Sequence, residues 1–143
     1  MIIDKFLTPW DNTALTDTAS SDAVDLTVTG DLSRSARPMR AVVRVGTAFT
    51  ASGSATGTFA LVQSDNADLS SPDTLYTTSA IAKATLVAGY GIMDIVLPRT
   101  SKRYLGFKFT VATGPMTAGT VTGTFVQDTE TPIADRLVGN TGM

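Results

Sequence analysis

The chain has 143 residues, a formal net charge of −2 and neither cysteine nor histidine. These absences exclude disulfides, thiol nucleophiles, imidazole bases and the commonest zinc ligands. The acidic balance argues against a general nucleic-acid binder, and no apolar run approaches the roughly 20 residues that cross a bilayer. We therefore expect one domain over residues 1–143 that is not an enzyme, has no cofactor or metal, and binds neither nucleic acid nor membrane. Its first residues do not resemble a signal peptide, which predicts synthesis in a cytoplasm.

The composition favours β-structure. Hydrophobic residues make up 43% of the chain and charged residues 17%, while threonine is abundant and Glu130 is the one glutamate. Branched residues suit a pleated surface, and strong helix formers are scarce. We predict an all-β fold, an antiparallel two-sheet sandwich or jelly roll, with extended N- and C-terminal arms.

The first 22 residues are polar and aperiodic and contain turn-forming clusters, which predicts an N-terminal arm over about residues 1–22. This arm carries three large apolar side chains, Phe6, Leu7 and Trp10. Apolar groups are poorly placed on a solvated tail. They are therefore candidates for docking, either on their own domain or on another protein.

Apolar and polar residues alternate over residues 23–29, 40–45 and 58–64, and this period of two predicts three strands. The segment 47–57 is rich in Gly, Ser and Thr and is expected to be a loop. Residues 65–76 combine turn-forming residues with no sustained apolar face. We expect a surface excursion that joins the two sheets.

The second half of the chain contains the clearest strand. Over residues 104–111 every second residue is apolar, a pattern that a helix does not explain. Residues 92–97 and 120–126 also read as strands, whereas residues 79–88 are compatible with a short helix and are expected to be extended. A second arm is predicted over residues 127–143.

Carboxylates in the loop at Asp65, Asp68 and Asp73 offer one route to acid–base chemistry. Aspartate beside Asn, Ser and Pro more often caps the backbone of a turn, and this is the interpretation we favour. The loop also fails as an EF-hand, because Ser70 and Tyr76 stand where glycine and glutamate are required.

Charge is distributed unevenly along the chain. The segment up to residue 31 is acidic, whereas Arg99, Lys102 and Arg103 form a short basic connection before the strongest strand. Two interpretations stay open: a solvated face with scattered ion pairs, or a surface that orients the protein on itself, on a sister subunit or on a larger charged surface.

Two stretches, residues 103–107 and 111–122, resemble the capsid cement (decoration) proteins of tailed phages, of the Bordetella-phage type. The opening Met1-Ile2-Ile3-Asp4-Lys5, the strand Val24-Asp25-Leu26, the segment 59–65 and the stop at Leu97-Pro98 resemble the same family in the same order. The resemblance implies a small jelly-roll protein that sits as an oligomer, a dimer or trimer, on the outer capsid surface of the virion. Its partner would be the major capsid protein, and it would have no enzymatic activity.

On this basis we expect Phe6, Leu7 and Trp10 to anchor the arm on a neighbour. Arg99, Lys102 and Arg103 would face an acidic patch of the capsid. The alternative is a receptor- or glycan-binding β-sandwich module of a phage tail or surface protein. A third hypothesis, an Asp/Glu glycoside hydrolase, requires two carboxylates facing each other in a cleft.

Overall fold

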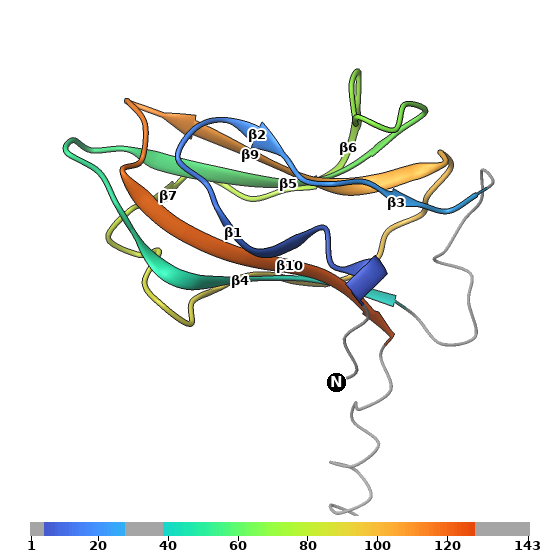
Figure 1. Cartoon of the computed structure of the whole chain (residues 1–143), viewed down its shortest axis with the longest axis horizontal. Helices are drawn as coiled ribbons and strands as arrows, with labels where there is room; N and C mark the ends of the chain where they lie inside the picture. The colour runs from blue at the N-terminus through green and yellow to red at the C-terminus, as the bar shows by residue number, and fades with distance from the viewer. Residues whose placement is uncertain (1–4, 28–38, 128–143) are drawn as a thin grey trace, which may run out of the picture.

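The computed structural model describes residues 5–27 and 39–127, and these form two antiparallel sheets packed face to face (Figure 1). The first sheet has the strand order β1-β10-β4-β8. The second has the order β2-β9-β5-β6, with β3 also paired to β9 and β7 to β5. The helix in the described residues is a single 3-10 turn, η1 (Lys5–Leu7). The predicted all-β sandwich is therefore confirmed.

The strands of the first sheet are β1 (Trp10–Ala14), β4 (Met39–Thr50), β8 (Gly91–Val96) and β10 (Ala118–Gln127). Those of the second are β2 (Ala19–Ser20), β3 (Val24–Asp25), β5 (Thr56–Ser64), β6 (Asp73–Thr77), β7 (Ile81–Ala82) and β9 (Tyr104–Ala112). The short strands β2 and β3 share one position beside β9, and β6 and β7 share one beside β5. With those pairs merged, the order within the two sheets is that of a jelly roll.

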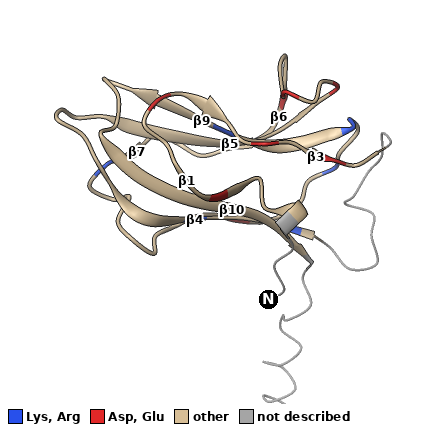
Figure 2. Ribbon diagram, viewed as in Figure 1, with Lys and Arg blue, Asp and Glu red and all other residues tan. Residues whose placement is uncertain are grey.

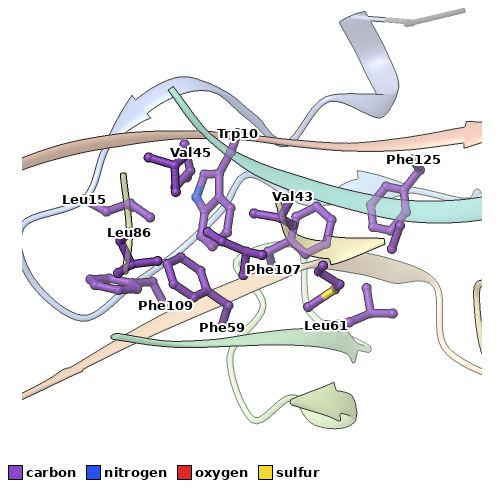
Figure 3. Packing of buried hydrophobic residues seen from close by; sticks show 14 of the residues in the cluster. Trp10, Leu15, Val43, Val45, Phe59, Leu61, Leu86, Phe107, Phe109 and Phe125 are labelled. Atoms are coloured by element: carbon purple, nitrogen blue, oxygen red, sulfur yellow. The ribbon is translucent and has the colours of Figure 1, made fainter. Parts of the chain in front are cut away.

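The core forms where the inward residues of both sheets meet. As the alternation predicted, β9 buries Leu105, Phe107 and Phe109 completely or nearly so. The Phe107 ring stacks on Phe125 of the opposite sheet, with ring centroids 4.9 Å apart, and on Trp10 at 5.4 Å (Figure 3). Stacked and edge-on aromatic pairs of this kind hold the two layers together.

The N-terminal arm is shorter than predicted. Residues 10–14 form β1, an edge strand paired with β10, and residues 19–20 form β2. The prediction is wrong there because β1 places one large side chain, Trp10, into the core and is followed by three polar residues and an exposed alanine, so no alternation marks it as a strand. Of the predicted C-terminal arm, Gln127 ends β10 and the rest lies outside the described residues.

Three other boundaries differ from expectation. The loop expected over residues 47–57 is largely strand, because β4 runs to Thr50 and β5 begins at Thr56. The excursion over residues 65–76 does not join the two sheets: it ends in β6, which pairs with β5 in the same sheet. The strand expected over residues 23–29 is confined to Val24–Asp25 within its described part.

Candidate functional site

The turn η1 presents one exposed aromatic ring. Leu7 is partly buried against the core, and its carbonyl accepts a hydrogen bond of 3.0 Å from the Thr124 hydroxyl of β10. The neighbouring Phe6 is 89% exposed. The sandwich therefore fixes the turn and displays Phe6 on it.

Trp10 does not belong to a docking surface. It is 1% exposed and pairs with Gly123 across β1 and β10. A side chain at Gly123 would begin only 3.0 Å from the Phe107 ring and 3.1 Å from Trp10, so the glycine makes room for the two rings. The expectation that Trp10 anchors an arm on a partner is corrected: it anchors β1 to its own core.

The predicted basic connection is paired with acids of its own chain. Lys102 Nζ lies 3.0 Å from Asp73 and 3.3 Å from Asp65. Arg103 donates two hydrogen bonds to the Asp25 carboxylate, at 2.7 and 2.9 Å, and its guanidinium lies 5.2 Å from the Tyr104 ring centroid. Figure 2 shows these charges together at the end of the sandwich where β3 and the β6 loop lie.

The pairing changes the ionisation of these groups in the expected directions. The hydrogen bonds from Arg103 hold the pKa of Asp25 below its ordinary value, and Asp25 raises the pKa of Arg103. The hydrogen bond to Asp73, with a further one to Asp65, raises the pKa of Lys102. Each of these shifts favours the charged form of the group, so Asp25, Lys102 and Arg103 are all stabilised as ions by partners of their own chain. Arg99, the remaining residue of the predicted basic connection, is exposed, and like Lys102 and Arg103 it has an interaction partner.

A buried glutamine positions this connection. Gln63 on β5 is nearly inaccessible, and its Oε1 accepts hydrogen bonds from the backbone N–H groups of Ser101 (2.9 Å) and Lys102 (3.3 Å). Its Nε2 lies 3.2 Å from the Ser101 hydroxyl and donates to it. The side chain thus fastens the β8–β9 connection to β5 of the second sheet. No sequence pattern indicated this role.

The acidic loop behaves as a turn. Asp68 Oδ1 accepts a hydrogen bond of 2.9 Å from the backbone N–H of Ser70, and the hydrogen bonds from Ser70 lower the pKa of Asp68. Asp65 and Asp73 converge on Lys102, not on each other across a cleft. In residues 5–27 and 39–127, no three acidic side chains gather in a way that could hold a metal ion. Glu130 lies outside these ranges.

An open hollow of about 410 Å³ lies at the edge of the sandwich where the chain crosses from one sheet to the other. One wall is formed by η1 and β1, and the other by residues 22–24, which lead into β3. Phe6, Asp11 and Asp22 are among its lining residues. No sequence pattern marks this hollow, because Asp11 and Asp22 lie in a polar segment without apolar periodicity.

No helix among the described residues reaches the length and apolar character of a membrane span. A search of curated proteins returns no match for the chain. The family model described as Bbp16 matches residues 10–125, which extend from the first residue of β1 nearly to the end of β10 and so include both sheets. The chain belongs to the Bbp16 family, whose name indicates a Bordetella phage protein.

Proposed function

We propose that this protein is a capsid decoration, or cement, protein that binds and stabilises the outer surface of a phage head. The observation that carries the proposal is the Bbp16 match over both sheets, joined to the resemblance of residues 103–122 to phage cement proteins. The partner is the major capsid protein, and the protein works as a dimer or trimer with no catalytic activity. Binding the assembled lattice more tightly than free subunits would stabilise the lattice by mass action.

Two structural observations support a protein-binding role over the alternatives. A glycan-binding module needs an exposed aromatic platform, whereas the single tryptophan of the chain is buried and the exposed rings of Phe6 and Tyr76 lie on separate elements, η1 and β6. A glycoside hydrolase needs two carboxylates placed to flank a sugar, whereas Asp65 and Asp73 flank a lysine of the same chain. Phe6, in contrast, is an exposed apolar group on an anchored turn.

The direct test is to add the purified protein to phage heads assembled without it and to measure co-sedimentation and heat release of the packaged genome. We expect saturable binding in proportion to the major capsid protein and a higher temperature of genome release. Electron cryomicroscopy of the mixture should show additional density on the outer surface. Binding to tail fibres or glycans with no binding to heads would refute the proposal in favour of the receptor-binding alternative.

A further inference from the structure

Asp25, the last residue of β3, joins two parts of the chain through one carboxylate. Arg103 donates to both of its oxygens, from Nε to Oδ1 at 2.7 Å and from Nη2 to Oδ2 at 2.9 Å. The backbone N–H of Thr27 donates to the same Oδ1, also at 2.7 Å. A two-pronged guanidinium–carboxylate pair is stronger and more specific in geometry than a single contact. Asp25 therefore connects the end of the β8–β9 connection to a residue two positions farther along its own segment.

Thr27 adopts a backbone conformation that threonine does not favour by itself. Its φ is 68°, in the left-handed region, where a β-branched residue is a rare outlier. Such conformations persist only where the surrounding structure holds them. The Thr27 hydroxyl donates to the carbonyl of the adjacent Leu26, a local bond that moves with the two residues. The bond to Asp25 is therefore the one that ties the strained residue to the sheet.

Beyond β3, the attachment of this segment to β9 is mostly polar. Val24 is buried in the core, whereas Asp25 and Thr27 are exposed and Leu26 is only partly buried. The Leu26 N–H donates to the Arg103 carbonyl at 2.9 Å. Arg103 thus contacts the segment twice, through its guanidinium at Asp25 and through its carbonyl at Leu26. Loss of the charged pair would weaken the attachment without disturbing the buried Val24.

The charge of Asp25 depends on pH, whereas that of Arg103 does not. The hydrogen bonds from Arg103 and from the Thr27 N–H keep the pKa of Asp25 below its ordinary value of 3.8, so the carboxylate loses its charge only in acid. Around the pair lie three groups that pair with one another and one ring beside the guanidinium: Lys102, Asp65, Asp73 and Tyr104.

We propose that Asp25 is a charge-controlled catch for residues 26–27. While it is ionised, it holds Leu26 and Thr27 beside Arg103; when its charge is lost, Thr27 relaxes and the two residues detach while the sandwich core stays closed. Acid is the natural signal, and Asp25→Asn imitates the protonated state at neutral pH. The inference concerns a change of conformation within the chain and does not depend on the proposed function.

The test is amide hydrogen exchange measured by NMR, expressed as protection relative to the unstructured chain so that the intrinsic effect of pH is removed. At neutral pH, Asp25→Asn should lower the protection of the Leu26 and Thr27 amides by at least about tenfold, because hydrogen bonds to a charged acceptor are replaced by weaker ones. The amides of Val43 and Leu61, in the central strands β4 and β5, should change by less than about threefold. Circular dichroism checks that the variant is folded.

A matched control is Asp94→Asn, which removes a carboxylate that pairs with Arg40 at 2.8 Å on the other sheet. The backbone ladder between β4 and β8 joins these strands independently of the ion pair. The control should leave the protection of Leu26 and Thr27 unchanged.

The pH dependence gives a second readout. In the wild type, the protection of Leu26 and Thr27 should fall as the pH drops through the folded pKa of Asp25, and Asp25→Asn should remove this step. Unchanged protection of the two amides in Asp25→Asn would overturn the inference. An equal loss at Val43 and Leu61 would also overturn it, because the change would then be global unfolding.

Discussion

Leu69 of the β5–β6 connection packs directly over Gly106 of β9, on the outer face of the second sheet. Leu69 is 2% exposed although it lies in a polar loop, and a Cβ built on Gly106 would overlap its Cδ1 atom. The neighbours of Gly106 along β9, Leu105 and Phe107, point into the core, so Gly106 and its cross-strand partner Val62 face outward. The loop is thus fastened to the sheet by a small apolar cluster outside the main core.

This contact predicts coupled effects on stability. Leu69→Ala should lower the free energy of unfolding by about 2–5 kcal/mol, because it removes a buried side chain. Gly106→Ala should lower it by about 1–3 kcal/mol through overpacking. The double variant should lose less than the sum, since the shorter residue 69 leaves room for the new methyl. Urea unfolding of the four proteins measures the coupling, and strict additivity would contradict the contact.

Substitutions of Trp10 and of Phe6 should separate effects on folding from effects on partner binding. Trp10→Ala should cost about 3–5 kcal/mol of stability, as expected for a buried aromatic residue that stacks on Phe107. Phe6→Ala, its exposed counterpart, should change stability by less than about 0.5 kcal/mol. The measurements are thermal unfolding and the emission of the single tryptophan, which should report a buried indole in Phe6→Ala. A large loss of stability in Phe6→Ala would show that the ring is part of the core.

Gln63 should control the local order of the β8–β9 connection. Gln63→Leu removes the acceptor of two backbone N–H groups and should cost about 1–3 kcal/mol. Ser101→Ala removes only the side-chain bond to Nε2 and should cost about 0.5–1.5 kcal/mol. Hydrogen exchange at the amides of residues 101 and 102 should accelerate strongly in the first variant and little in the second. Equal acceleration in both would show that the glutamine carbonyl is not the tether.

The pair between Asp25 and Arg103 should contribute stability that depends on pH. Because the pKa of Asp25 is lowered in the folded protein, its contribution is present above the ordinary value of 3.8 and is lost as the pH falls through the folded pKa. Arg103→Gln should raise the Asp25 pKa toward its ordinary value, while the hydrogen bond from the Thr27 N–H keeps part of the shift. Carboxyl NMR titration measures this change. Arg44→Gln, a charge removal on the other sheet, should leave the Asp25 titration in place.

The long central strands could be predicted from the sequence, and the edges of the fold could not. Residues 104–111 form β9 as expected, because both neighbours of the strand impose the same inward and outward alternation. β1 has the sequence Trp-Asp-Asn-Thr-Ala, in which a single side chain is buried, and Asn12 adopts a positive φ of 50° at a break in register. β6 is exposed along most of its length. Edge strands of this kind are defined by their partners and carry little periodicity of their own.

For the same reason, the candidate site could be predicted from the sequence only in part. Phe6 could be recognised as an apolar residue in a polar segment, and the structure leaves it exposed. Trp10 has the same signature in the sequence but lies in the core. Asp25 and Arg103 are 78 positions apart, and which cation meets which acid depends on the pairing of β3 with β9. The hollow itself exists only because the chain changes sheets between β1 and β2.

The position of η1 has a practical consequence for displaying foreign peptides. The turn between β4 and β5 lies at the far end of the sandwich from η1 (Figure 1), and Gly53 at its tip has no atom within 4 Å of a Cβ built on it. A peptide inserted at Gly53 should therefore be accessible to antibodies and leave η1 and the exposed Phe6 unchanged, because the length of the sheets separates the two places.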